Sequence, residues 1–184
     1  RVNSQGSRKA KEFLIQDDYD SIVLIGREQV ESGAHVLDVC VAMNEREDEA
    51  AQMEKVVKKL SLGVEAPLVI DSTEASVIDV ALKSLPGRGI INSINMENGR
   101  KRIDAVCPIA KRHGAALVAL TIDEEGMAKT SERKLDVAAN IHRIVTEEYG
   151  ISPELLIFDA LTFTLATGEK EFLDSAIETM EGIR

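Results

Sequence analysis

The chain has 184 residues, of which 44% are hydrophobic, and it can therefore bury the core of one globular domain. Its net charge of −10 would repel a phosphate backbone, and with no tryptophan it offers little on which bases could stack, so we expect no nucleic-acid partner. We also expect a cytoplasmic protein without membrane contact, because no segment approaches the roughly 20 apolar residues that cross a bilayer and the N-terminus lacks a signal-peptide core.

In chain order, five apolar runs of strand length alternate with longer segments of helical period. The runs are 35–42, 67–71, 89–95, 115–123 and 154–161. This alternation is typical of βα units that build a parallel sheet. Because the runs are continuously apolar, we expect both faces of the strands to be covered.

Six helices are predicted around these runs. One covers 21–32, and a second begins at Asn44, where Glu47 completes the spacing of a capping box. The remaining helices are predicted after Asp71 as far as "PGRG" (86–89), over about 98–112, over about 131–148 from Thr130 or Ser131, and after Gly168.

The two cysteines, Cys40 and Cys107, lie in apolar surroundings without a partner at metal-ligand spacing. We interpret them as buried thiols, in agreement with a reducing compartment. The histidines His35, His113 and His142 show no metal-binding spacing either, so no metal site is predicted.

Each apolar run carries Asp or Asn at or near its C-terminal end: Asp38, Asp71, Asn92, Asp123 and Asp159. The carboxyl ends of parallel strands are where α/β folds bind ligands, and in a βα barrel they converge on one mouth. The alternative is that these residues only cap the following helices, since Asp and Asn are preferred N-cap residues.

Three of the five do not have the spacing of a cap, because Asp38, Asn92 and Asp159 are each separated by several residues from the next predicted helix. Carboxylates that accept from N–H groups, beside an amide that donates and accepts, suit an amino-substituted heteroaromatic ring such as a pterin or a purine. A phosphate ligand is not indicated, because neither GxGxxG nor GxxxxGK[ST] occurs.

Four segments carry a resemblance to a known family: "GAHVLDVCVA", "LVIDSTEASVIDVALKSLPGRGIINSIN", "HGAALVALTIDEEGMAKT" and "GISPELLIFDALTFTLATG". In this order they resemble the methyltetrahydrofolate:corrinoid methyltransferases, including the pterin-binding domain of cobalamin-dependent methionine synthase. The opening "RVNSQGSRK" is similar to the end of that family's first-strand motif, Gly-Glu-Arg-x-Asn. The resemblance extends over nearly the whole chain.

The resemblance implies a (β/α)8 TIM barrel that binds 5-methyltetrahydrofolate at its C-terminal mouth. It implies transfer of the N5 methyl group to cob(I)alamin, held by another domain or a corrinoid protein, in the synthesis of methionine from homocysteine. A homocysteine-binding domain would be a further part of the full-length enzyme.

The family motifs also assign residues. Asp71, Asn92 and Asp159 match positions that hydrogen-bond the pterin, with Asn92 and Asp159 as the catalytic pair, and Asp38 matches a further polar position of the mouth. At the position of Cys40 many members carry Asn, so a polar role there is lost or altered.

A complete barrel needs about 250 residues and eight strands, whereas this sequence supplies five clear strand runs and six helices. We therefore expect residues 1–184 to be one incomplete pterin-binding barrel domain, with the first strand and the last two strands outside it, and the isolated piece to be inactive.

Two other functions remain open from the residues. A dihydropteroate synthase-like transferase on the same scaffold would need basic residues for a pyrophosphate, whereas these strand ends are acidic or neutral. The chain could also be a non-catalytic folate-binding module, which would bind folate without methyl transfer.

Overall fold

The computed structural model describes residues 2–164, 166, 168 and 172–184. Six strands form one sheet in the order β1-β2-β3-β4-β5-β8. They are β1 (Val2–Asn3), β2 (Leu37–Cys40), β3 (Leu68–Asp71), β4 (Ile90–Ile94), β5 (Ala116–Leu120) and β8 (Leu156–Asp159). The pairs β1–β2, β2–β3, β3–β4 and β5–β8 run parallel. The predicted α/β class, with parallel strands alternating with helices as in part of a (β/α)8 barrel, is confirmed.

All five predicted runs contain a strand of this sheet, and β1 adds a sixth strand that the apolar pattern did not indicate. Strand β1 has only two residues, which is too short for a periodic signal, and it is held by pairing with β2. The run at 115–123 is divided: β5 ends at Leu120, and β6 (Ile122–Asp123) forms an antiparallel hairpin with β7 (Gly126–Met127).

Seven α-helices are found in the described part of the chain: α1 (Arg8–Ile15), α2 (Tyr19–Glu31), α3 (Glu49–Gly63), α4 (Ala75–Ser84), α5 (Lys101–His113), α6 (Ser131–Arg143) and α7 (Ser175–Ile183). Helix α6 continues as a π-helix over Ile144–Glu148, so the helix predicted at 131–148 is confirmed. Of the helix predicted after Gly168, residues 169–171 lie outside the described residues. No helix in the described ranges is long and apolar enough to cross a membrane.

The predicted capping box at Asn44 is wrong, because α3 begins five residues later, at Glu49. The guanidinium of Arg46 holds the preceding segment outside the helix. It donates to Asp17 at 2.9 Å and to Asp48 at 2.7 Å. These bonds tie the segment before α3 to the segment after α1, so a tertiary contact accompanies the helix start at Glu49 where the local pattern predicted Asn44.

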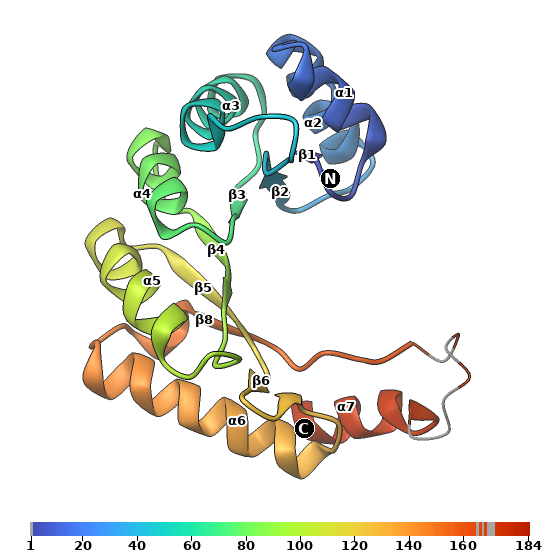
Figure 1. Cartoon of the computed structure of the whole chain (residues 1–184), viewed down its shortest axis with the longest axis vertical. Helices are drawn as coiled ribbons and strands as arrows, with labels where there is room; N and C mark the ends of the chain where they lie inside the picture. The colour runs from blue at the N-terminus through green and yellow to red at the C-terminus, as the bar shows by residue number, and fades with distance from the viewer. Residues whose placement is uncertain (1, 165, 167, 169–171) are drawn as a thin grey trace. The chain divides into compact units, whose positions relative to one another are not determined.

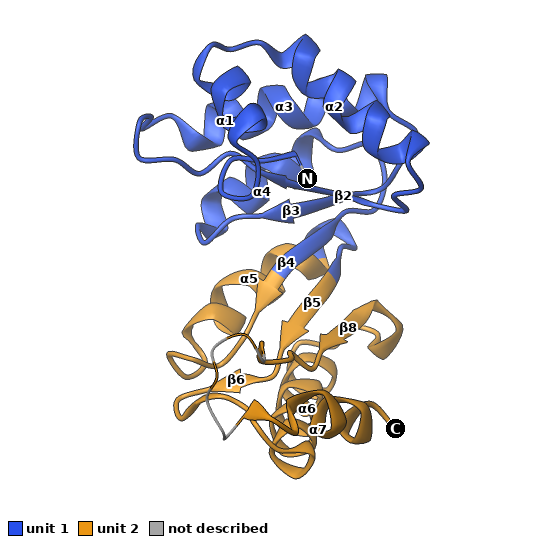
Figure 2. Cartoon of the chain, turned by 90° about the vertical axis from the view of Figure 1, so that its right-hand side faces the viewer, with its two compact units in different colours: residues 1–92, 112–116 blue, residues 93–111, 117–184 orange. Residues whose placement is uncertain are grey.

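The chain divides into two compact units, which Figure 2 shows in different colours. Unit 1 comprises residues 1–92 and 112–116, and unit 2 comprises residues 93–111 and 117–184. In unit 1, helices α2, α3 and α4 follow one another along β2 and β3 (Figure 1). The core residues of unit 1 include Leu37, Met53, Leu60, Ile70 and Ile91, and those of unit 2 include Ile103, Val106, Leu117, Ile141 and Val145.

The expectation that every strand is covered on both faces is wrong for β3 and β8. In β3 burial alternates: Leu68 and Ile70 are buried, while Val69 and Asp71 are half-buried. Strand β8 lies at one end of the described strand order, and its Ile157 is 45% exposed. The apolar run therefore identified the strands but did not show which face packs.

A charged cluster in unit 1 ties α4 to the residues at the end of α5. The carboxylate of Asp79 accepts hydrogen bonds from Lys83 at 2.6 Å and Arg112 at 2.8 Å, and it lies 2.8 Å from Nε2 of His113. These bonds, with that from Lys83 first, lower the pKa of Asp79 to about 2. The ionised carboxylate is thus favoured in the folded chain.

We expect Asp79→Asn to lower the free energy of unfolding by about 1–2 kcal/mol at neutral pH. Because the folded-state pKa lies below the unfolded value of 3.8, this contribution is complete above about pH 4 and is lost as the pH falls towards about 2. Urea unfolding of both proteins from pH 7 to pH 3 measures the difference, which should fall by about half at pH 3. A difference that is the same at both ends would contradict the assignment, and Asp136→Asn, at an exposed position of α6, is the control.

Candidate functional site

Three of the predicted site residues come together in unit 1, at neighbouring strands. Asp71 is the last residue of β3 and is paired in register with Asn92 of β4. Asp38 lies on β2, in register with Val69, two residues before Asp71. Asn92 lies within hydrogen-bonding reach of Asp38, with Nδ2 3.5 Å from Oδ1. The parallel register thus gathers side chains that are far apart in the sequence.

Asn3 connects the two carboxylates of this cluster. Its Nδ2 donates to Oδ2 of Asp38 at 2.7 Å and to Oδ2 of Asp71 at 3.1 Å. The side chain is only 5% exposed, and its Oδ1 accepts from the backbone N–H groups of Gln5 at 2.8 Å and Gly6 at 2.9 Å. Both ends of the amide are therefore satisfied, which fixes its orientation.

Asn3 is the site residue that sequence reasoning missed. The signal was present, because Asn3 is the last residue of the segment that resembles the first-strand motif Gly-Glu-Arg-x-Asn. Its contacts explain why an asparagine suits this position: one amide donates to two carboxylates while its oxygen closes the turn after β1. We name Asn3, Asp38, Asp71 and Asn92 the strand-end cluster.

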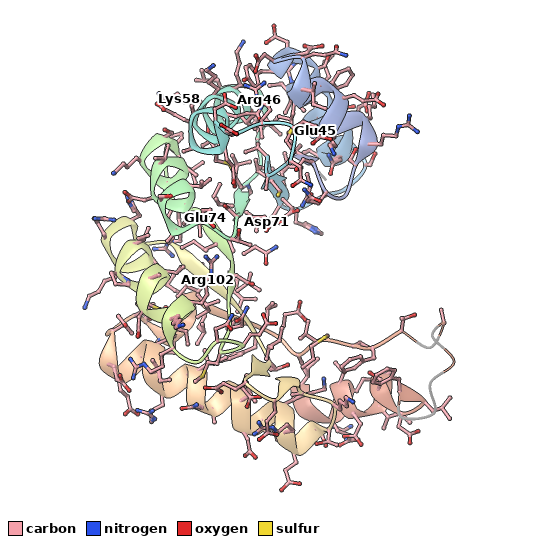
Figure 3. All side chains as sticks on the ribbon, viewed as in Figure 1. Glu45, Arg46, Lys58, Asp71, Glu74 and Arg102 are labelled. Atoms are coloured by element: carbon pink, nitrogen blue, oxygen red, sulfur yellow. The ribbon has the colours of Figure 1, made fainter. Side chains whose placement is uncertain are left out.

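Asp71 does not cap the helix that follows it. The N-cap residue of α4 is Glu74, three positions further on. The backbone N–H of Glu74 is bonded to the hydroxyl of Ser72 at 3.1 Å. Figure 3 shows Asp71 at the end of β3 and Glu74 at the start of α4. The role of the Asp71 carboxylate is therefore not that of a helix cap.

Asp159 belongs to unit 2 and is the last residue of β8. Its Oδ1 accepts from the backbone N–H of Leu161 at 2.9 Å, so its carboxylate closes a local turn and is not a helix cap. Asp159 is an exposed residue. The predicted position of Asp159 at the C-terminal end of its strand is thus confirmed.

The fifth strand-end acid, Asp123, lies in the β6–β7 hairpin and forms an ion pair with Arg133, which also contacts Glu125 at 3.2 Å. Asp123 is therefore held by structural contacts within unit 2. In the described residues no group of three or more His, Cys, Asp or Glu side chains is arranged to hold a metal ion.

The two cysteines are free and buried, as predicted. Cys40 follows Asp38 on β2 and is 4% exposed. Burial, followed by the charge of Asp71, raises the pKa of its thiol, and burial raises that of Cys107 to about 12. Both thiols are therefore protonated and poor nucleophiles at neutral pH.

Parallel strands that bring carboxylates and amides together at or near their carboxyl ends are typical of α/β proteins that bind a polar organic ligand. The chain belongs to the family of pterin binding enzymes, because the sequence model of that family matches residues 1–184.

Among curated relatives, the chain is 39% identical over 187 residues to the methionine synthase of Mycobacterium tuberculosis (strain ATCC 25618 / H37Rv). It is 38% identical to the methionine synthase of Mycobacterium leprae (strain TN). All of this chain is covered in both cases, but only 16% and 15% of the relatives, so it spans about one sixth of their length.

A solved structure of the Xanthomonas albilineans dihydropteroate synthase shares the fold. Its TM-score is 0.59 at 16% sequence identity, over 77% of this chain and 52% of that one. At this identity the similarity concerns the fold alone, and it supports the pterin-binding type of α/β fold.

Proposed function

We propose that this chain binds 5-methyltetrahydrofolate through the strand-end cluster of unit 1, and that it presents the N5 methyl group for transfer to cob(I)alamin in methionine synthesis. For Asp159, in unit 2, we propose a pterin contact on the ground of its match to the family motif alone. The observation that carries the proposal is the contact of Asn3 with both Asp38 and Asp71. Asp71 is in register with Asn92 on the neighbouring strand. The chain that holds this cluster is 39% identical to a methionine synthase.

The chemistry of the cluster suits the pterin ring. The ring presents an amino group and a ring N–H side by side, and a carboxylate such as Asp71 accepts from both. Asn92 can donate through Nδ2 and accept through Oδ1, so it can bind a ring nitrogen both with and without its proton. Asn3 restrains the carboxylates before the ligand arrives, which reduces the entropy lost on binding.

Methyl transfer from N5 is slow without help, because the departing nitrogen is a poor leaving group unless it carries a proton. In the proposal, Asn92 and Asp159 favour the cationic form of the ring, and the residues of this chain contribute orientation and electrostatics. Cobalamin, when bound, supplies the nucleophile that accepts the methyl group. It is assigned to another domain or partner protein, as is homocysteine.

Titration with 5-methyltetrahydrofolate tests the proposal. We expect Asp71→Asn and Asn92→Ala to weaken binding about tenfold or more, since each loses a hydrogen bond to a charged or polar ring edge. Asp136→Asn, a charge change at an exposed position of α6, should bind as the unmodified protein does. Equal titrations for all four proteins would reject the site.

A second measurement, made on the complete barrel domain because the isolated piece is expected to be inactive, separates an enzyme from a binding module. Loss of the methyl group from bound 5-methyltetrahydrofolate on addition of cob(I)alamin supports the transferase. Binding without transfer supports the non-catalytic folate-binding module. A dihydropteroate synthase-like activity is not favoured, because the four members of the strand-end cluster are two carboxylates and two amides, and none of them is a basic side chain for a pyrophosphate.

A further inference from the structure

Lys134 is the one charged side chain in the described residues that is almost completely buried, at 1% exposure. It lies on α6, whose other charged residues are consistent with a solvated face. Its ammonium group donates to three backbone carbonyls: Ala128 at 2.8 Å, Ala160 at 2.6 Å and Leu161 at 2.9 Å. Because an ammonium group has three N–H donors, all of them are satisfied, and this permits its burial.

Two of these three carbonyls belong to the turn that directly follows Asp159. The same turn is closed from the other side, because Oδ1 of Asp159 accepts from the N–H of Leu161 at 2.9 Å. The hydroxyl of Thr179 on α7 donates to the Leu161 carbonyl at 2.7 Å. Lys134 and Thr179 thus both hold the carbonyl of Leu161.

The turn requires such support because Leu161 has a φ of 54°, in the left-handed region. For a residue other than glycine this conformation costs about 1–2 kcal/mol. It persists only where the surrounding structure stabilises it, and such strain is typical of functional segments. Burial lowers the pKa of Lys134, and the nearby carboxylates of Asp159 and Glu178 oppose this by favouring the charged form.

We propose that Lys134 is a positioning residue that holds the Asp159–Leu161 turn in the strained conformation which presents Asp159 to the pterin. This inference rests on the proposed function, in which Asp159 contacts the ring. Lys134 itself touches no ligand in this arrangement. It acts by fixing the carbonyls of Ala160 and Leu161, and hence the backbone from which the Asp159 carboxylate projects.

A double-mutant cycle on the affinity for 5-methyltetrahydrofolate tests the inference, with Lys134→Met, Asp159→Ala and the double variant. We expect each single change to weaken binding about tenfold, and the double variant to be little weaker than either. If Lys134 acts through Asp159, it has nothing left to position once the carboxylate is gone. A purely structural lysine would give additive losses, and additive losses would overturn the inference.

The control is Lys111→Met, which removes another lysine of unit 2 that donates to a backbone carbonyl, that of Tyr149 at 2.8 Å. It should leave folate affinity unchanged. If Lys134→Met does not fold, Thr179→Val removes the second donor to Leu161 with little change in volume, and it must weaken binding in the same cycle.

The outcomes distinguish the two proposals. Normal binding by Lys134→Met beside weak binding by Asp159→Ala overturns the inference and leaves the proposed function intact. Normal binding by Asp159→Ala removes the pterin role of Asp159, and the inference with it.

Discussion

Replacing Asn3 with leucine is expected to lower the free energy of unfolding by about 3 kcal/mol and to weaken binding of 5-methyltetrahydrofolate about tenfold or more. The change removes the donor that lies 2.7 Å from Asp38 and 3.1 Å from Asp71, and it leaves two neighbouring carboxylates to repel each other. It also removes the acceptor for the N–H groups of Gln5 and Gly6, so the turn after β1 loses its closure.

Urea unfolding measures the first effect, and titration with 5-methyltetrahydrofolate measures the second. Asn44→Leu is the matched control, because Asn44 is an exposed asparagine of the same unit. Asn3→Asp separates the two duties of the amide: the oxygen that accepts from Gln5 is kept, while the donor to the carboxylates is lost. If Asn3→Leu is as stable as Asn44→Leu, the amide does not organise the cluster.

The strand ends of the site could be predicted because their signal is local. An apolar run that stops on Asp71, or that contains Asn92, marks a strand and its polar end within a few residues. The parallel register then places Asp71, the last residue of β3, beside Asn92, which lies within β4. The α/β class and the positions of five strands followed from the same local pattern.

Asn3 and Lys134 could not be found in this way, because their roles depend on distant parts of the chain. Asn3 belongs to a strand of two residues, and its partner Asp38 lies 35 positions away. Lys134 has the sequence context of a solvated helix lysine. Its ammonium group is buried because it donates to backbone carbonyls that lie up to 27 residues later in the chain. The covered faces of the strands were mispredicted for the same reason, since apolar content does not specify which neighbour packs on which face.

Replacing Ile70 with alanine is expected to lower the free energy of unfolding by about 3–4 kcal/mol. The side chain is fully buried, at 0% exposure, on the face of β3 that it shares with buried Leu68. Truncation loses the transfer free energy of the removed carbons and leaves a cavity that a close-packed core fills only in part. Val69→Ala, at a half-buried position of the same strand, should cost about 1 kcal/mol. Equal losses for the two variants would contradict the one-sided packing of β3.

Asp71 is the neighbour of Ile70 on the opposite face of β3, so the two positions should separate folding from binding. For Ile70→Ala we expect a large loss of stability, while the molecules that remain folded bind 5-methyltetrahydrofolate nearly as well as before. For Asp71→Asn we expect the reverse, because the isosteric amide keeps the packing but loses the charge that the ring would meet. Urea unfolding measures the stability of both variants, and folate titration measures their affinity. Parallel losses in both variants would mean that β3 does not divide core and site between its two faces.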